Sequence, residues 1–316
     1  MSIFKKPSQL NPKYAISALI YGTPGAGKTT LACSAPGAVL LDYDNGVTRI
    51  HGAHQVPTLQ VKSWDETQAA LDEIEASPEI QSVVVDTVGK MLYFMEKSII
   101  ANNSKMQKFD GSLSLQGYGV RKQMFINFIK RVTGMGKNVI FVAHDKEEKN
   151  GDTTRVRPEV GGSSAADLMK ELDLVGYIQM YGNERTIAFD PTEQYYAKNT
   201  CGMNGIIKLP VLIDPATNLP TGENNFLCAV IDAYQARQRQ NIQQTSKYET
   251  LCNEITERVD TIESAKDAND FAAWMQGVEH IFNSRAKAQT AFAAKVAALG
   301  LVYNKSTKQY TDAKAN

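Results

Sequence analysis

The sequence predicts an α/β core built on a mainly parallel sheet, followed by a small α-helical domain. Three observations support this class. Apolar, β-branched runs alternate with amphipathic stretches up to about residue 199, a glycine-rich loop at 22–29 separates the first run from the first helix, and a stretch rich in Gly, Pro and Asn at 201–225 precedes a purely helical pattern. We therefore expect a core at 1–222 and a helical domain with a basic tail at 223–316.

The core is expected to consist of short buried strands separated by helices. Continuous apolar runs, typical of strands covered on both faces, predict strands at 14–21, 38–44, 58–61, 82–87 and 138–144. Helices are expected after the glycine-rich loop, after Ser63, and at 91–100, 118–133 and 165–172. The Asn150-Gly151 pair predicts a hairpin over 145–160, and further strands are expected at 175–181, 185–189 and 195–199. The polar stretch 101–116 is expected to form a long mobile loop.

The C-terminal domain is expected to contain three helices. Their predicted ranges are roughly 224–260, 267–282 and 285–299. Asp267 is the expected N-cap of the second helix, and Gly300 is the expected stop after the third.

Composition and charge exclude several classes of function. The formal net charge is zero, so any nucleic-acid site must be a local patch. The four cysteines are scattered, without the spacing of a zinc site. No apolar run is long enough to cross a bilayer, and the N-terminus lacks the apolar core of a signal peptide. We therefore expect a cytoplasmic protein with no membrane partner.

The glycine-rich loop carries the strongest functional signal in the chain. It fits the phosphate-loop pattern G-x-x-x-x-G-K-[ST] at every fixed position, and it lies between an expected strand and an expected helix. Glycines allow backbone N–H groups to surround a phosphate chain, and Lys28 can reach the β- and γ-phosphates. The expected cofactors are ATP and Mg²⁺. The expected nucleotide-binding residues are Gly22, Thr23, Pro24, Gly25, Ala26, Gly27, Lys28, Thr29 and Thr30.

Polar residues follow the carboxyl ends of several expected strands, where ligands bind in open α/β sheets. Asp86 ends the strand at 82–87, and in a phosphate-loop protein this is the carboxylate on the Mg²⁺ side. The hydroxyl of Thr29 is the second expected metal ligand. Asp44 and His144 end two further strands, so we expect all of these groups at one edge of the sheet.

Taken in order, these motifs resemble the RecA-like ATPases, and most closely the phage-encoded ATP-binding proteins that act as single-strand annealing recombinases. The resemblance covers about residues 14–205. It is carried by Tyr21–Thr30, Leu41-Asp42-Tyr43-Asp44, Val83-Val84-Val85-Asp86-Thr87, Val142-Ala143-His144-Asp145-Lys146 and Ala197-Lys198-Asn199.

The resemblance implies catalytic roles for five residues. Lys28 and Asp86 would act on the phosphates and the metal, as above. Asp44 stands where RecA has a glutamate that polarises the attacking water, and the shorter side chain implies slow hydrolysis. His144 stands where RecA has a glutamine that senses the γ-phosphate, although a simple strand-end histidine is the alternative. Lys198 matches a basic residue that reaches the ATP of a neighbouring subunit, which implies a homo-oligomer, as a ring or a filament.

Three cationic segments are candidates for binding single-stranded DNA, because each combines positive charge with flexible or aromatic neighbours. Solvated loops or a solvated tail are the alternatives. The candidate residues are Lys105 and Lys108 in the loop before residue 118, Arg155 and Arg157 in the hairpin, and Lys305 and Lys308 in the basic segment 285–316, which also holds Lys314.

The sequence thus predicts an ATPase whose turnover DNA stimulates. We expect it to bind single-stranded DNA and to promote strand annealing or exchange in phage recombination, with a single-strand-binding protein as a further candidate partner. One alternative is a phage ATPase that works as a helicase-like motor or loader. A second is a nucleotide-gated binding module with little hydrolysis.

Overall fold

The computed structural model describes residues 3–151, 153–162, 164–182 and 184–312. The chain forms two compact units. The larger unit is Lys13–Gln235, and the smaller combines Met1–Pro12 with Ala236–Asn316.

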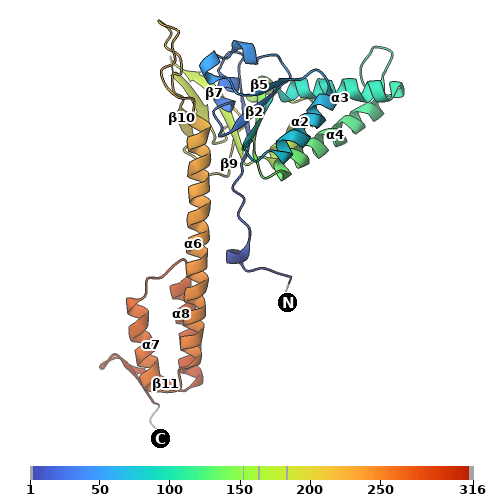
Figure 1. Cartoon of the computed structure of the whole chain (residues 1–316). Coiled ribbons are helices and arrows are strands. Elements are labelled where there is room, and N and C mark those ends of the chain that lie inside the picture. The colour runs from blue at the N-terminus through green and yellow to red at the C-terminus, as the bar shows by residue number, and fades with distance from the viewer. Residues whose placement is uncertain (1–2, 152, 163, 183, 313–316) are drawn as a thin grey trace. The chain divides into compact units, whose positions relative to one another are not determined.

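The larger unit is organised around one mixed sheet with the order β10-β8-β7-β1-β5-β4-β2-β3 (Figure 1). The strands are β1 Ser17–Gly22, β2 Ala38–Asp42, β3 Thr58–Gln60, β4 Ser82–Asp86, β5 Asn138–Asn150, β6 Thr153–Pro158, β7 Leu174–Tyr181, β8 Glu184–Ala188, β9 Lys198–Asn199 and β10 Ile206–Lys208. The six from β3 to β7 along this order are parallel, whereas β8 pairs antiparallel with β7, and β10 pairs antiparallel with β8. Strand β5 lies between β1 and β4, so the strand of the phosphate loop and the strand of Asp86 are separated by one strand.

Helices cover both faces of the sheet. They are α1 Lys28–Ala32, α2 Trp64–Ala76, α3 Val88–Asn102, α4 Leu115–Gly134, α5 Ser164–Glu171 and the first turns of α6 Phe226–Asp260, with short 3-10 helices at Val47–Arg49, Gly52–His54 and Ser104–Met106. A further 3-10 helix, Pro7–Gln9, belongs to the smaller unit. Apolar residues of α2, α3, α4 and α5 pack in one core, and those of α1 and the start of α6 pack in another.

Successive side chains of each strand point to opposite faces of the sheet, and both faces are buried. Leu19 and Tyr21 of β1 belong to the core beneath α2–α5, and Ala18 and Ile20 belong to the opposite core. A strand that is covered on both sides must be apolar at every position, which is the pattern seen in the sequence. The predicted α/β class, with a mainly parallel sheet in the core and a helical C-terminal region, is confirmed.

The units divide at a different residue from the predicted boundary at 222. The first turns of α6 belong to the larger unit, because Leu227, Val230 and Ile231 pack in the core around α1. The side chain of Tyr234 reaches the backbone of the same unit, where its hydroxyl donates to the carbonyl of Lys13 at 3.1 Å.

The smaller unit is built from helices and one hairpin. It holds the rest of α6 with α7 Ala265–Gly277, α8 Ser284–Ala298, β11 Leu301–Asn304 and β12 Gln309–Asp312. The predicted N-cap Asp267 is wrong, because Ser264 caps α7 and Asp267 completes the capping box from the third position. Gly300 follows α8 with a φ of +70°, as expected of a helix stop.

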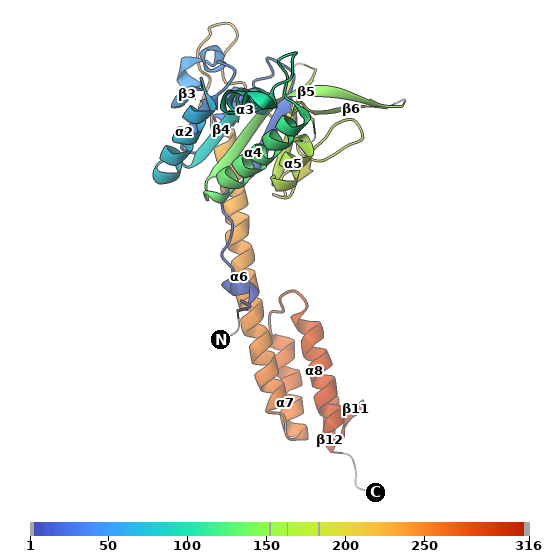
Figure 2. The same ribbon diagram turned by 90° about the vertical axis from the view of Figure 1, so that its right-hand side faces the viewer.

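Two irregular segments have more structure than the sequence indicated. The expected tail after Gly300 is a β-hairpin up to Asp312, and Lys314 lies outside the described residues. The expected loop at 101–116 is reduced to residues 103–114, between α3 and α4, and these contain a 3-10 helix at Ser104–Met106 and a β-bridge between Gln107 and Leu113. Figure 2 shows this helix pair and the β5–β6 hairpin of the larger unit. Over the part of the chain that the structure describes, no helix is long and apolar enough to cross a membrane.

Candidate active site

The phosphate loop connects β1 to α1, and the structure explains why two of its positions require glycine. Gly22, at the end of β1, lies so close to β7 that a Cβ would be 2.6 Å from the carbonyl oxygen of Ile178. Gly27 has a φ of +87°, in the left-handed region that favours glycine, and it directly precedes α1. The loop therefore keeps its compact turn only with these two residues.

A cavity of about 300 Å³ opens above this loop. It is lined by Pro24, Gly25, Gly27, Lys28, Thr29, Thr30, Asp44, Gly46, Arg49, Ile50, Asp86, Thr87, His144 and Arg185. Four of the five residues with predicted catalytic roles are among them. They come from three strand ends and the loop, so the parallel sheet brings together groups that lie up to 116 positions apart in the chain.

Lys28 is held inside the loop. Its side-chain amine donates to the carbonyl oxygen of Thr23 at 2.8 Å and lies 3.5 Å from Nδ1 of His144. Burial lowers the pKa of this amine, and the negative charge of Asp86 acts in the opposite direction. A phosphate group beside the amine would favour its charged form.

Asp86 and Thr29 form the expected metal-side pair. The Thr29 hydroxyl donates to Oδ2 of Asp86 at 2.5 Å. Burial raises the pKa of the Asp86 carboxyl to about 6, although the hydrogen bond from Thr29 lowers it. A buried carboxylate beside a hydroxyl is a suitable pair of oxygen ligands for Mg²⁺, which uses one or two protein oxygens together with phosphate oxygens and water. The two residues therefore fit the ion.

Asp42 has a structural role at the end of β2. One carboxylate oxygen accepts from the backbone N–H groups of Asp44 and Gly46, at 3.1 and 3.0 Å, and the other accepts from Val47 at 2.9 Å. The side chain is 1% exposed, so these three bonds satisfy a buried charge. Asp42 thereby shapes the turn that presents the next aspartate.

Asp44 faces the cavity and is partly exposed. Its carboxylate forms two long ion pairs, to Arg49 at 3.8 Å and to Lys90 at 3.9 Å. Neither pair is close enough to neutralise the carboxylate fully, which leaves its oxygens free to accept a hydrogen bond from a water molecule. This is the placement expected of a residue that orients an attacking water.

His144 is part of the cavity, beside the phosphate loop. It pairs with Gly22 across the parallel strands β5 and β1. Burial lowers the pKa of its imidazole, and the charge of Lys28 lowers it further. A neutral ring can accept a hydrogen bond from the Lys28 amine through Nδ1, so the ring lies where it can respond to charge at the phosphate site.

Arg185, on β8, is a site residue that the sequence analysis did not identify. A Cβ on Gly27 would lie 2.7 Å from one terminal nitrogen of its guanidinium. Among the described residues, no carboxylate pairs with this guanidinium. A single arginine in an antiparallel strand carries no motif, so only the pairing of β8 with β7, next to β1, reveals its position over the loop.

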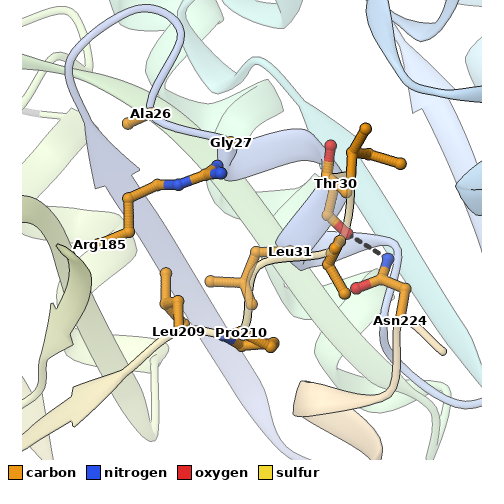
Figure 3. Close-up of a pocket in the computed structure, with 10 residues that line it drawn as sticks. Ala26, Gly27, Thr30, Leu31, Arg185, Leu209, Pro210 and Asn224 are labelled. Atoms are coloured by element: carbon orange, nitrogen blue, oxygen red, sulfur yellow. Dashed lines mark hydrogen bonds between the residues drawn. The ribbon is translucent and has the colours of Figure 1, made fainter. Parts of the chain in front are cut away.

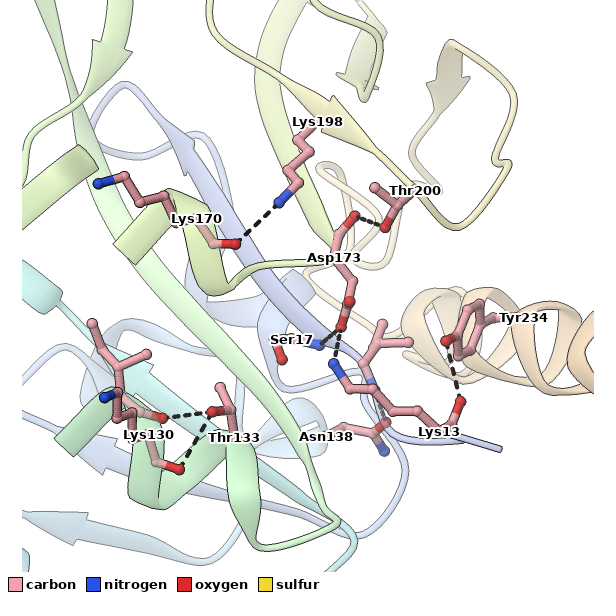
Figure 4. A network of polar contacts seen from close by, with 12 residues as sticks. Lys13, Ser17, Lys130, Thr133, Asn138, Lys170, Asp173, Lys198, Thr200 and Tyr234 are labelled. Atoms are coloured by element: carbon pink, nitrogen blue, oxygen red, sulfur yellow. Dashed lines mark hydrogen bonds and ion pairs between the residues drawn. The ribbon is translucent and has the colours of Figure 1, made fainter. Parts of the chain in front are cut away.

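Lys198 lies elsewhere in the same unit. Its amine donates to the carbonyl oxygens of Met169 and Lys170, at 3.2 and 3.5 Å, near the C-terminus of α5 (Figure 4). It lines a cavity of about 500 Å³ that does not include the phosphate loop. The lysine is therefore remote from the phosphate loop of its own chain, and its predicted action on a neighbouring subunit stays a prediction.

The two arginines of the hairpin are both engaged in contacts. Arg155 donates to the carbonyl oxygen of Thr192 at 3.1 Å, and its guanidinium stacks on the ring of Tyr196 at 4.9 Å. Arg157 pairs with Glu148 at 3.2 Å. Both side chains are partly buried, so less of their charge is available to a polyanion than the sequence indicated.

The other DNA candidates are more open. Lys105 and Lys108 are exposed in the connection between α3 and α4, beside the fully exposed ring of Phe109. Lys305 and Lys308 are exposed in the turn of the β11–β12 hairpin. None of the four lysines forms an ion pair with another described residue.

The phosphate loop, the buried lysine and the metal-side carboxylate define a P-loop NTPase. Comparison with known families agrees, because residues 15–201 match the family AAA_24, described as an AAA domain. This match spans more than half of the 316 residues, so the chain belongs to that family of P-loop ATPases.

Individual relatives are more distant. The SPbeta prophage-derived uncharacterized protein YorG of Bacillus subtilis (strain 168) is 24% identical over 171 residues, which are 52% of this chain and 50% of that protein. The chain thus spans about half the length of this curated relative. A solved structure, the KaiC-like protein PH0186 from Pyrococcus horikoshii OT3, aligns over 63% of this chain and 91% of its own, with 12% identity and a TM-score of 0.36.

Proposed function

We propose that the protein is an ATP-dependent recombinase that binds single-stranded DNA and promotes strand annealing or exchange in phage DNA. The observation that carries the ATPase part is the convergence of Lys28, Asp44, Asp86 and His144 on the cavity above the phosphate loop. Two exposed groups of lysines support the DNA part, and the prophage-derived relative supports a phage setting.

The proposed hydrolysis assigns one task to each group. Lys28 neutralises charge on the β- and γ-phosphates, and Arg185 adds a second positive charge from β8. Thr29 and Asp86 would hold Mg²⁺, which would supply further positive charge to the phosphate oxygens. Asp44 orients the attacking water, and its side chain, which is shorter than that of glutamate, favours slow turnover.

Two separate segments are proposed to bind DNA: the connection between α3 and α4 in the larger unit, and the turn of the β11–β12 hairpin in the smaller unit. Lys105 and Lys108 combine with Phe109, and Lys305 and Lys308 lie close in sequence to Tyr303 and Tyr310, whose rings are 5.1 Å apart. Cations that contact phosphates next to aromatic rings that stack on bases are the usual elements of single-strand binding without sequence preference.

The proposed assembly is a homo-oligomer, as a ring or a filament, in which Lys198 acts on the nucleotide of the next subunit. Its remoteness from the phosphate loop of its own chain supports this assignment, because a purely intramolecular role at the phosphates is out of its reach. A single-strand-binding protein is a further proposed partner, since it covers the same DNA.

A nucleotide-gated binding module is the second candidate function. The specific observation in its favour is Asp44, which is shorter than glutamate and lies within 4 Å of Arg49 and Lys90. Such a carboxylate would support binding of ATP with rare hydrolysis.

ATP turnover measured with and without single-stranded DNA tests the proposal, together with annealing of complementary labelled strands. A recombinase of this type should show faster turnover on DNA and faster annealing with ATP. Tight ATP binding with no turnover under either condition would favour the binding module. Separation of duplex strands without annealing would favour a motor.

A further inference from the structure

A second, smaller cavity of about 110 Å³ adjoins the phosphate site. The two share Gly27, Thr30 and Arg185 as lining residues. The other walls are mostly apolar, and Figure 3 shows most of them: Ala26, Leu31, Leu209, Pro210, Leu212 and Ile213, with Asn224 at one side. An apolar pocket with one polar group, next to a phosphate cradle, is the kind of surface that accepts a flat heterocycle.

The side chain of Asn224 is fixed by one hydrogen bond. Its Nδ2 donates to the carbonyl oxygen of Thr30 at 2.7 Å (Figure 3). A backbone carbonyl can only accept, so the amide nitrogen must face it and the amide oxygen must point the other way. The orientation of the carboxamide is thus determined by its partner.

The amide oxygen of Asn224 has no partner among the described residues, although it is buried. A buried acceptor without a donor costs free energy, so the site favours a ligand that brings an N–H group. Of the buried side-chain atoms in the described chain that lack a partner, this oxygen is the one on a residue that lines the smaller cavity.

We propose that the smaller cavity receives the adenine base of ATP and that Oδ1 of Asn224 accepts a hydrogen bond from its exocyclic amino group. The proposal rests on nucleotide binding at the phosphate loop, as proposed above. Guanine carries a carbonyl oxygen where adenine carries the amino group, so two acceptors would face each other. Asn224 is therefore the residue that distinguishes ATP from GTP.

Arg185 connects the smaller cavity to the cavity above the phosphate loop. It lines both cavities, so a single nucleotide can extend from the phosphate loop past the guanidinium to the apolar walls. The segment between β10 and α6 supplies Leu209, Pro210 and Asn224, which means that the base pocket is built by the part of the core that leads to the C-terminal helices.

The first test changes the ligand and leaves the protein intact. Calorimetric titration with Mg²⁺ compares ATP, GTP and purine riboside triphosphate, in which a hydrogen replaces the amino group of adenine. Loss of one hydrogen bond to a buried acceptor should weaken binding of the purine analogue about tenfold. GTP should bind more weakly still. Equal affinity for ATP and the purine analogue would overturn the proposal.

The second test changes the protein. Asn224→Ala should lower the affinity for ATP to that for the purine analogue, and it should leave the analogue nearly unaffected. A purely structural role, through the bond to Thr30, would weaken all nucleotides by the same factor. Asn225→Ala is the matched control, since this neighbouring asparagine is exposed and does not line the cavity. That control should keep the preference for ATP.

A third variant separates this proposal from the proposed function. Lys28→Ala should weaken ATP, GTP and the purine analogue alike, because the lysine contacts only phosphates. If the unaltered protein binds none of the three, nucleotide binding and the adenine pocket both fail. If the unaltered protein binds all three nucleotides equally and Lys28→Ala abolishes binding, nucleotide binding at the phosphate loop is supported. The proposed recognition of adenine by Asn224 would then be wrong.

Discussion

At the scale of single residues, the phosphate site contains a buried carboxyl group, Asp86, and a buried amine, Lys28, and burial disfavours the charged form of each. Burial raises the pKa of Asp86 to about 6 and lowers the pKa of Lys28. Both shifts favour the neutral forms. Negative phosphates would favour the charged amine of Lys28, and positive Mg²⁺ would favour the ionised carboxylate of Asp86. Ligand binding should therefore be strongly coupled to the protonation of both groups.

Binding of Mg²⁺ and ATP should therefore depend on pH through Asp86. The ion needs the carboxylate, so affinity should fall as the pH decreases through about 6, where Asp86 takes up a proton. Asp86→Asn should bind Mg²⁺–ATP weakly at every pH and lose this dependence. Titrations from mildly acidic to mildly basic buffer check this. An unchanged pH profile in the variant would show that another group controls the metal site.

The same carboxyl group should affect the stability of the ligand-free protein. A folded-state pKa raised above the unfolded value of about 3.9 stabilises the fold at low pH, and this contribution is lost as the pH rises through about 6. Asp86→Asn removes the buried negative charge, so it should raise the melting temperature by a few degrees at neutral pH and by less near pH 4. Thermal melts without Mg²⁺ or nucleotide test this, and a lower melting temperature at neutral pH would contradict it.

Asp44 and Asp42 should respond differently to the same substitution. Asp44→Asn should leave ATP affinity within about twofold and slow hydrolysis by roughly a hundredfold, because a water-orienting carboxylate acts mainly in the transition state. Asp42→Asn should instead destabilise the fold by about 1–3 kcal/mol, since one carboxamide oxygen cannot replace a carboxylate that accepts three backbone hydrogen bonds. Single-turnover kinetics and thermal melts distinguish the two. Hydrolysis at the parent rate in Asp44→Asn would remove it from the mechanism.

At the scale of elements, the parallel strands position most of the residues around the phosphate loop, and the antiparallel strand β8 adds one more. The carboxyl ends of β1, β2 and β4 bring the phosphate loop, Asp44 and Asp86 together with His144, which lies where the parallel pairing of β5 with β1 ends. The antiparallel strand β8 adds Arg185 from the far side of β1. By contrast, β9 places Lys198 against the C-terminal turn of α5.

Lys198 should contribute to hydrolysis only in the assembled protein. Lys198→Ala should reduce turnover, and a mixture with Lys28→Ala should recover part of it, because each variant supplies the group that the other lacks across a subunit boundary. Lys170→Ala is the control, since this exposed lysine lines the same cavity and pairs with Asp167. If mixtures show no recovery and Lys198→Ala only lowers the melting temperature, the lysine serves as a helix C-cap.

At the scale of the whole molecule, the net charge is zero, but the exposed charged side chains are unevenly distributed. Lys287 and Lys295 of the smaller unit are engaged with Tyr248 and with the carbonyl oxygen of Asp260. Lys305 and Lys308 remain exposed in the hairpin turn. The unit therefore offers a small cationic surface, next to two tyrosine rings, in place of a uniformly basic tail.

Neutralising this surface should weaken single-strand binding in a salt-dependent way. The double change Lys305→Gln and Lys308→Gln should reduce the slope of log affinity against log salt by about 1.4, which is the release expected for two phosphate contacts. Lys247→Gln with Lys266→Gln removes the same charge from exposed positions elsewhere in this unit and should have little effect.

Binding isotherms at several salt concentrations decide the outcome. If the hairpin change leaves the slope unaltered while Lys105→Gln with Lys108→Gln reduces it, the DNA lies on the connection between α3 and α4. In that case the smaller unit must serve another purpose.

The sequence by itself determined the class of fold and the phosphate loop, and it placed Asp86 at the end of a buried strand. Each depends on local information: continuous apolar runs that can only be doubly covered strands, and eight consecutive positions whose spacing the phosphate requires. Even the convergence of Asp86 and His144 could be expected, because carboxyl ends of parallel strands meet at one edge.

Only the tertiary structure decided which residues complete the site. Arg185 and Asn224 lie 158 and 197 positions after Gly27, from differences in residue number, and neither belongs to a local pattern. Their placement depends on an antiparallel strand, β8, and on a segment that folds back over α1. The structure also shows that Arg155 and Arg157 are engaged in contacts. The sequence did not indicate this, because the availability of a cation depends on which residues pack against it in the fold.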